Sequence, residues 1–184
     1  MKHTHILVIR PGAIGDVLLT FPVLQALREA YVNPQITLVS NAVVLPLALA
    51  SGIVDEVFDY QDIRWSELFS EPGIHAPAVL DLLAQIDLAI CWLRDPDHIV
   101  EQNLREAGVK RVIVAPGRPP EGTRVHIVEY LGGTVGLSPT QGTVGLPSVQ
   151  GTRKGHPYHT RAGSCMVGVP LAGTLGWSGG HLHP

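Results

Sequence analysis

The stretch from Ile6 to Tyr31 constrains the fold more than any other part of this sequence; it reads ILVIRPGAIGDVLLTFPVLQALREAY. The short apolar run Ile6–Ile9 is followed by a glycine-containing turn and then by apolar residues at helical spacing. This order is typical of a strand, a tight loop and a helix. In an open parallel sheet the loops that follow the strands form the ligand crevice, so we expect residues 10–16 to lie on the functional surface.

Strand-like apolar runs recur along the chain, most of them separated by enough residues for a helix. Strands are predicted at Ile6–Ile9, Ile36–Val39, Glu56–Phe58, Leu88–Cys91 and Arg111–Val114. Helices are predicted after Asp16 and at Ala42–Ala50, Ala76–Gln85, Pro96–Ala107 and from Arg124 to about Gly132. This alternation indicates an α/β fold with a Rossmann-like parallel sheet flanked by helices.

Pro22 interrupts the first helical segment. Because proline has no backbone N–H to donate, the helix is either kinked at this point or preceded by a separate short turn that Thr20 caps. The sequence leaves both alternatives open.

The 184 residues can hold one ordinary domain, or one domain and an appendage. Beyond Tyr130 the chain has no aspartate or glutamate, and no strand–helix alternation can be followed through Gly151–Pro184. We therefore predict a Rossmann-like domain over residues 1–147 and an atypical tail, rich in glycine and histidine and poorly ordered, over 148–184. A frame change or a truncation in the gene would produce such a tail.

Composition excludes several classes of function. A net charge of −3 provides no basic surface for nucleic acid. No apolar stretch reaches the ~20 residues of a membrane span, and the N-terminus lacks the pattern of a secretory signal. Two cysteines are too few for a disulfide framework or a zinc ribbon, so we expect a cytoplasmic protein without a bound metal, in which Cys91 is a core thiol. His156 and His159 have helical spacing, but they define no metal geometry.

The loop Gly12-Ala13-Ile14-Gly15 lacks the complete glycine patterns of dinucleotide and P-loop sites, so no cofactor is predicted. In one interpretation Gly12 and Gly15 only permit a sharp turn. In the other, Gly12, Ala13 and Gly15 are substrate-binding residues, because small side chains let a ligand approach the backbone and the positive end of the next helix.

Asp16, Arg10 and His126 are the candidate functional side chains. Asp16 can complement free N–H groups and the dipole at the helix start, or it can act as a general base on an acceptor hydroxyl. A helix N-terminus stabilises the ionised carboxylate, so such a base requires a closed, dehydrated site. Arg10 can clamp a substrate carboxylate or phosphate, or pair with an acid of the protein. His126 either faces the cleft or is a hydrogen-bonded helix histidine.

The run IRPGAIGDVLLTFPVLQALR, from Ile9 to Arg28, resembles the start of glycosyltransferase family 9, the ADP-heptose:lipopolysaccharide heptosyltransferases and their relatives. The shared features are a basic residue that ends the first strand, a small-residue loop, Gly15-Asp16, a hydrophobic stretch with Pro22, and the pattern Leu24-x-x-Leu27-Arg28. More diffuse similarity covers about the first 145 residues.

This resemblance implies a GT-B architecture of two Rossmann-like halves, of which this chain is the N-terminal, acceptor-side half. It implies transfer of a sugar, with inversion, from a nucleotide sugar to a lipid-linked or cell-envelope saccharide, as in lipopolysaccharide biosynthesis at the inner face of the cytoplasmic membrane. Asp16 would be the catalytic base, and Arg10 would contact an anionic acceptor. In the family the donor nucleotide is held mainly by the second half, and this sequence departs from the pattern after about Pro147.

Little or no activity is therefore expected from this chain alone. A general base contributes a rate factor of ~10²- to 10⁴-fold, which does not replace electrostatic stabilisation of the leaving group. The nucleotide-sugar donor is expected as a partner only when a second domain is present. The alternative is a non-catalytic Rossmann-like module that binds a saccharide or a protein, or forms a homo-oligomer. A third interpretation is another nucleotide-dependent enzyme on the same fold.

Overall fold

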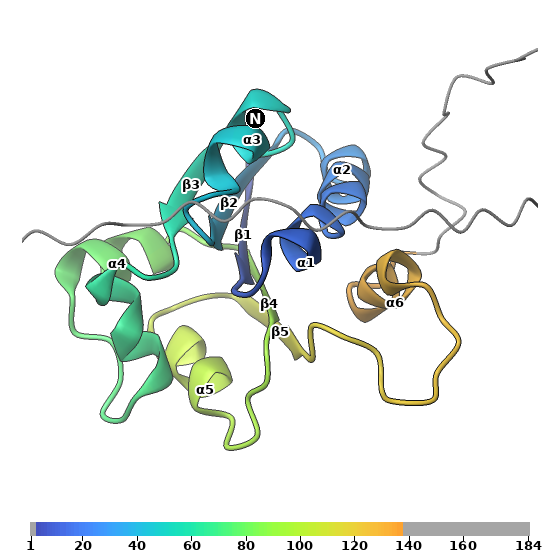
Figure 1. Cartoon of the computed structure of the whole chain (residues 1–184). Helices are drawn as coiled ribbons and strands as arrows, with labels where there is room; N and C mark the ends of the chain where they lie inside the picture. The colour runs from blue at the N-terminus through green and yellow to red at the C-terminus, as the bar shows by residue number, and fades with distance from the viewer. Residues whose placement is uncertain (1–2, 138–184) are drawn as a thin grey trace, which may run out of the picture. The chain divides into compact units, whose positions relative to one another are not determined.

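Five parallel strands form one sheet in the computed structural model, which describes residues 3–137. The strands are β1 (Thr4–Arg10), β2 (Pro34–Ser40), β3 (Glu56–Asp59), β4 (Leu88–Trp92) and β5 (Arg111–Ala115). Their spatial order is β3-β2-β1-β4-β5 (Figure 1), and every neighbouring pair is parallel. The α/β prediction and all five predicted strands are confirmed. The order reverses between β1 and β4, which is where ligands bind in sheets of this kind.

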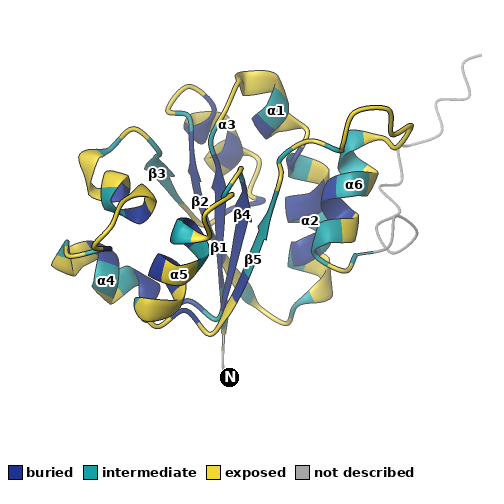
Figure 2. Ribbon diagram, turned by 90° about the horizontal axis from the view of Figure 1, so that it is seen from below, coloured by how far each residue is buried: buried dark blue, intermediate teal, exposed yellow. Residues whose placement is uncertain are grey.

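Apolar residues alternate between the two faces of the sheet. In β1, Ile6 and Val8 pack into one core, whereas Leu7 and Ile9 pack into the other, because successive side chains of a strand point to opposite faces. Both cores are covered by helices, and the central strands are buried between them (Figure 2). The sheet is thus the middle layer of three.

The first face is covered by α2 (Phe21–Ala30), α3 (Leu45–Ala50) and α6 (Ile127–Thr134). The second face is covered by the 3₁₀ helix η1 (Ile63–Phe69), α4 (Pro77–Leu83) and α5 (Ile99–Glu106). Both views show α2 and α6 on the side opposite α4 and α5 (Figures 1 and 2). Cys91 is fully buried in the second core, as predicted, and burial raises the pKa of its thiol.

The first helical segment consists of two separate helices. The short helix α1 (Ile14–Leu18) ends before α2 begins, and Pro22 lies in the first turn of α2, where its missing N–H costs no helical hydrogen bond. The alternative with a separate turn is therefore correct. Thr20 is the N-cap residue of α2, but its hydroxyl donates to the Val17 carbonyl (2.5 Å) and caps nothing.

The sequence analysis did not predict η1. A buried amide holds this element against α5: Asn103 Nδ2 donates to the carbonyls of Leu68 and Ser70, both at 3.1 Å. Asn103 is only 6% exposed, so these bonds satisfy a polar group that would otherwise be costly to bury. A single 3₁₀ segment held by a distant amide has no helical periodicity of its own to detect.

Within residues 3–137 no helix is both long enough and apolar enough to cross a bilayer. The predicted domain boundary at residue 147 and the predicted tail over 148–184 lie outside the described residues.

Candidate active site

The Asp16 side chain lies in the first turn of α1, directly after the loop that leaves β1. It is 21% exposed, so the carboxylate is neither sealed in the core nor fully solvated. The N-cap residue of α1 is Ala13, and no side chain caps this end by a hydrogen bond. Among the described residues Asp16 therefore does not cap the helix by a hydrogen bond, and its structural role at the helix start is the interaction with the helix dipole.

Both carboxylate oxygens of Asp16 accept from one nitrogen of Arg118. The distances from Arg118 Nη2 are 2.8 Å to Oδ2 and 3.1 Å to Oδ1. This hydrogen bonding and the charge of Asp16 raise the pKa of Arg118, whose side chain is 73% exposed. The sequence analysis missed Arg118. The available signal was its position just after β5, because the carboxyl ends of parallel strands share one edge of the sheet.

Arg10 is buried, with only 4% of the residue exposed. Its Nη1 donates to the Trp92 carbonyl (3.0 Å) and its Nη2 to the Gly117 carbonyl (2.9 Å). Among the described residues its Nε has no hydrogen-bond partner. Burial lowers the pKa of Arg10; Asp16 opposes that shift and Arg118 adds to it. The guanidinium thus connects the end of β1 to the end of β4 and to the segment after β5, and carbonyls rather than a carboxylate hold it.

Gly117 is required by the close approach of this guanidinium. A Cβ at residue 117 would overlap Arg10 Nη1 and would lie 2.7 Å from Arg10 Cζ and 2.9 Å from the Trp92 carbonyl oxygen. No real Cβ adopts such contacts, so the buried arginine and the glycine depend on each other. The sequence analysis did not single out this glycine, because only the tertiary contact explains it.

The small residues of the loop before α1 have different roles. Gly12 has a φ of +136°, which favours glycine, and a Cβ there would lie 3.7 Å from Asp16 Oδ2. Gly15 has a helical conformation, and nothing lies within 4 Å of the position that its Cβ would occupy. The backbone conformation of the turn therefore explains why residue 12 is a glycine, but it does not explain why residue 15 is one. Whether a substrate approaches Gly12, Ala13 or Gly15 stays a prediction.

Gly15→Ala is expected to stabilise the free protein by about 0.5 kcal/mol, because alanine loses less conformational entropy in a helix. Gly12→Ala is the contrasting variant and is expected to destabilise it by about 1 kcal/mol or more, because its backbone is strained for any other residue. Urea unfolding of both variants measures the difference. A loss of stability in Gly15→Ala would mean that this position has a packing role that the geometry does not contain.

A cavity of about 890 Å³ lies at the same edge of the sheet; Arg118, the partner of Asp16, lines it, whereas Asp16 itself is not among its lining residues. Its lining comes from the ends of β1, β4 and β5 and from the start of α5, and includes Arg10, Trp92, Gly117 and Arg118. Several prolines and Leu93 supply apolar surface. The cavity is thus a mostly apolar hollow with guanidinium groups in its wall, the composition expected of a small-molecule site.

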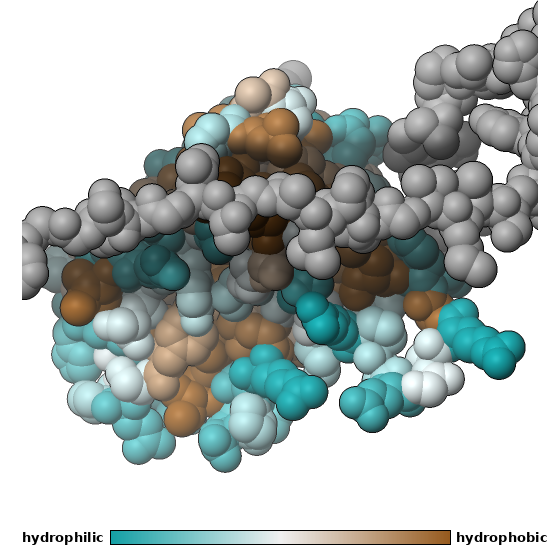
Figure 3. All heavy atoms as spheres, viewed as in Figure 1, coloured by the Kyte–Doolittle hydropathy of each residue, from teal (hydrophilic) through white to brown (hydrophobic). Residues whose placement is uncertain are grey.

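Apolar side chains are also exposed close to this edge. On α1 and the residue that follows it, Ile14, Leu18 and Leu19 are exposed; on α3 and the residues before it, Val43, Leu47 and Leu49 are exposed. Figure 3 shows apolar residues over α3 at the top of the view. Exposed apolar surface of this extent is common at interfaces.

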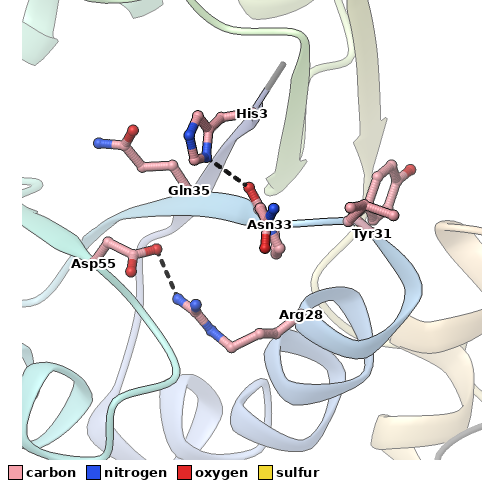
Figure 4. A pocket seen from close by; sticks show the side chains of 8 residues that line it. His3, Arg28, Tyr31, Asn33, Gln35 and Asp55 are labelled. Atoms are coloured by element: carbon pink, nitrogen blue, oxygen red, sulfur yellow. Dashed lines mark hydrogen bonds and ion pairs between the residues drawn. The ribbon is translucent and has the colours of Figure 1, made fainter. Parts of the chain in front are cut away.

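A second hollow, of about 770 Å³, lies at the opposite edge, where the strands begin (Figure 4). Arg28 lines this hollow and is hydrogen-bonded within the protein: its Nη2 donates to Asp55 Oδ2 (2.7 Å) and its Nε to the Ile53 carbonyl (3.1 Å). His3 contacts the Asn33 carbonyl at 3.3 Å. Arg28, the last residue of the family-like run, therefore braces α2 against the segment before β3 and is remote from Asp16.

His126 is the N-cap residue of α6, and its Nδ1 accepts from the backbone N–H of Val128 at 3.3 Å. Of the two interpretations, the hydrogen-bonded helix histidine is correct. Within residues 3–137 no group of three or more histidine, cysteine, aspartate or glutamate side chains is placed to hold a metal ion. His156 and His159 lie outside the described residues.

No protein-family model matches the chain, and no curated protein matches it. Among solved structures, a glycosyl transferase of family 9 from Veillonella parvula aligns with a TM-score of 0.50 and 17% identity, over 76% of this chain and 44% of that one. E. coli ADP-heptose lipopolysaccharide heptosyltransferase II aligns with a TM-score of 0.45 and 19% identity, over 60% of this chain and 30% of that one. An E. coli heptosyltransferase with ADP aligns with a TM-score of 0.45 and 15% identity, over 73% of this chain and 48% of that one.

The likeness to the Veillonella parvula protein shows the fold and nothing finer, because the identity is low. The chain spans less than half the length of each of these three proteins. On the strength of the Veillonella parvula alignment, the five-stranded parallel sheet with its flanking helices is a Rossmann-like α/β fold of the kind found in a family 9 glycosyltransferase.

Proposed function

We propose that this chain is the acceptor-side part of a glycosyltransferase similar to family 9, in which Asp16 is the general base. The observation that carries the proposal is the position of the Asp16 carboxylate. It is 21% exposed at the carboxyl edge of the sheet, and its partner Arg118 lines a cavity of about 890 Å³. A carboxylate beside a ligand-sized hollow at the switch point of the sheet is suited to proton transfer.

The proposed reaction moves one proton and one sugar. The acceptor hydroxyl gives its proton to an Asp16 oxygen while the hydroxyl oxygen attacks the anomeric carbon of the donor sugar. The bond from that carbon to the nucleotide diphosphate breaks, the diphosphate leaves with the bonding electrons, and the anomeric configuration inverts. Because the departing diphosphate carries the developing charge, groups that stabilise it contribute a large part of catalysis. In this proposal a second, donor-binding domain supplies those groups.

The acceptor proposed here is a saccharide of the cell envelope, presented at the inner face of the cytoplasmic membrane, as in lipopolysaccharide biosynthesis. The resemblance of residues 9–28 to family 9 supports this substrate class. Arg10 and the small residues Gly12, Ala13 and Gly15 are proposed to border the bound acceptor. In the free protein the Arg10 guanidinium already donates to two backbone carbonyls, so its proposed contribution to acceptor binding is its positive charge.

Ligand-dependent unfolding of the full 184-residue chain tests the proposal. A truncated lipopolysaccharide acceptor at about ten times its Kd is expected to raise Tm by about 4 °C, whereas ADP-heptose alone leaves Tm unchanged. No sugar transfer is expected from the two together, because the leaving group lacks its stabilising groups. Stabilisation by ADP-heptose alone, or transfer by this chain without a partner, would contradict the acceptor-side assignment.

A non-catalytic binding or oligomerisation module is the second candidate. The exposed apolar residues of α1 and α3, such as Ile14 and Leu47, favour it, because a second copy of the chain could cover them. A stable dimer in light scattering, together with no saccharide binding in calorimetry, would support this candidate over the enzyme.

A further inference from the structure

We infer that Arg118 exchanges partners: an oxyanion of the ligand binds its guanidinium at the cavity wall and releases Asp16. The shared chemistry is a carboxylate or a phosphate group. The functional meaning of this exchange rests on the proposed role of Asp16 as a base. The exchange itself is a binding equilibrium and can be measured without any sugar transfer.

The Asp16–Arg118 pair is built in a way that permits exchange. Only Nη2 of Arg118 contacts the carboxylate, so the guanidinium is not engaged as a two-pronged fork. The Arg118 side chain is 73% exposed, and exposed ion pairs of this kind contribute little free energy. A ligand oxyanion that engages two guanidinium nitrogens would therefore compete well with Asp16.

The surroundings of this pair favour an anion. Arg10 is buried next to it, and its Nη atoms are held by neutral carbonyls. Asp16 is the carboxylate whose charge acts on Arg10 and also on Arg118. Two guanidinium groups thus share the one carboxylate of Asp16.

Three acids line the cavity together with three arginines, and two of these acids are held by groups outside the Asp16–Arg118 pair. The two oxygens of Asp95 accept from the backbone N–H groups of Val100 (3.1 Å) and Glu101 (3.0 Å). The Glu101 carboxylate accepts from Arg105 at 2.6 Å. Glu121 is exposed on the rim, opposite in charge to Arg94, which is also exposed and lines the same cavity.

The exchange would make the site selective. While the cavity is empty, both oxygens of Asp16 accept from Arg118, so an acceptor hydroxyl has to compete with the guanidinium for them. When an anionic ligand binds Arg118, the carboxylate is released beside the same ligand. An acceptor without an anionic group would leave Asp16 occupied, so Arg118 is a specificity-determining residue in this scheme.

NMR titrations of the full chain with inorganic phosphate and with acetate, at constant ionic strength, test the exchange. Phosphate is expected to shift the amide signals of Gly12, Gly117 and Arg118. Arg118→Gln is expected to weaken phosphate binding at least about fivefold, and Arg118→Lys less, because lysine keeps the charge without the planar fork. A response to phosphate alone assigns a phosphate group, and a similar response to acetate assigns a carboxylate. No response to either anion overturns the inference.

The Asp16→Asn variant separates exchange from simple repulsion. Because it removes the competitor for Arg118, it is expected to tighten phosphate binding about two- to fivefold. In an Arg118→Gln background the same change is expected to alter binding less than about 1.5-fold, since no competition remains. A gain that persists in that background would show that Asp16 merely repels the anion, and would overturn the exchange.

Arg64→Gln is the matched control, because Arg64 is likewise an exposed arginine paired with an aspartate, Asp62, but lies on η1. It is expected to leave phosphate binding unchanged. The outcomes are independent of the proposed function. Exchange without acceptor binding would refute the glycosyltransferase proposal alone, and acceptor binding without exchange would refute this inference alone.

Discussion

Gly117→Ala is expected to destabilise the protein by about 3 kcal/mol. The new methyl group would overlap the Arg10 guanidinium and lie 2.9 Å from the Trp92 carbonyl oxygen. The arginine, only 4% exposed, would have to leave two carbonyls without their donor and its own charge without its partners. Buried polar groups that lose their partners each cost about 1–3 kcal/mol, and charged ones more. The change in urea unfolding free energy measures this effect.

Two further variants identify the cause. Gly133→Ala is the matched control, since nothing lies within 4 Å of its Cβ position in α6, and it is expected not to destabilise the protein. In an Arg10→Ala background, Gly117→Ala is expected to cost about 1–2 kcal/mol less, because the clashing guanidinium is gone and only the contact with the Trp92 carbonyl remains. An equal cost in both backgrounds would show that Arg10 is not the reason for the glycine.

Asp16→Asn is expected to lower sugar transfer about 10²- to 10⁴-fold, the usual contribution of a general base. Because the chain alone is expected to be inactive, the assay uses a chimera in which this chain replaces the matched part of the Veillonella parvula protein. The amide has nearly the same shape as the carboxylate but cannot accept the proton. The loss should therefore appear in kcat more than in KM.

Asp81→Asn provides the control for this assay, because Asp81 is an exposed aspartate on α4, on the other side of the sheet from α2 and α6. Its transfer rate is expected to match that of the unsubstituted chimera. Transfer by the Asp16→Asn chimera at a rate within about threefold of its parent would exclude Asp16 as the base.

The strands could be predicted from the sequence because each is a short apolar run whose pattern is local. The same holds for the loop that brings Asp16 to the carboxyl edge, where strand, turn and helix follow one another within residues 6–31. Helix boundaries were predicted less well: the sequence left open whether the helix is kinked at Pro22 or preceded by a separate turn, and η1 was missed. The break before Pro22 is held by a local bond from the Thr20 hydroxyl to the Val17 carbonyl, whereas η1 is held by a tertiary contact, the Asn103 amide.

Half of the candidate site was missed in the sequence, where its one available signal was a position just after a predicted strand. Arg118 and Gly117 follow β5, about a hundred residues from Asp16 and Arg10, and no local pattern distinguishes them from other loop residues. Arg10 was expected as a substrate clamp or an ion-pair partner. The observed contacts to two backbone carbonyls depend on how three segments meet, which one sequence does not reveal.

The buried guanidinium of Arg10 has a consequence for how this edge of the sheet could change over time. One side chain fastens the ends of β1 and β4 and the segment after β5, so a change in its contacts alters the free energy of folding as well as the shape of the hollow beside it. Arg118 has no such structural role, because its side chain is mostly exposed and, among residues 3–137, its hydrogen bonds go to Asp16 alone. New ligand preferences should therefore be reached more readily through Arg118 than through Arg10, and engineering of this surface is best begun there.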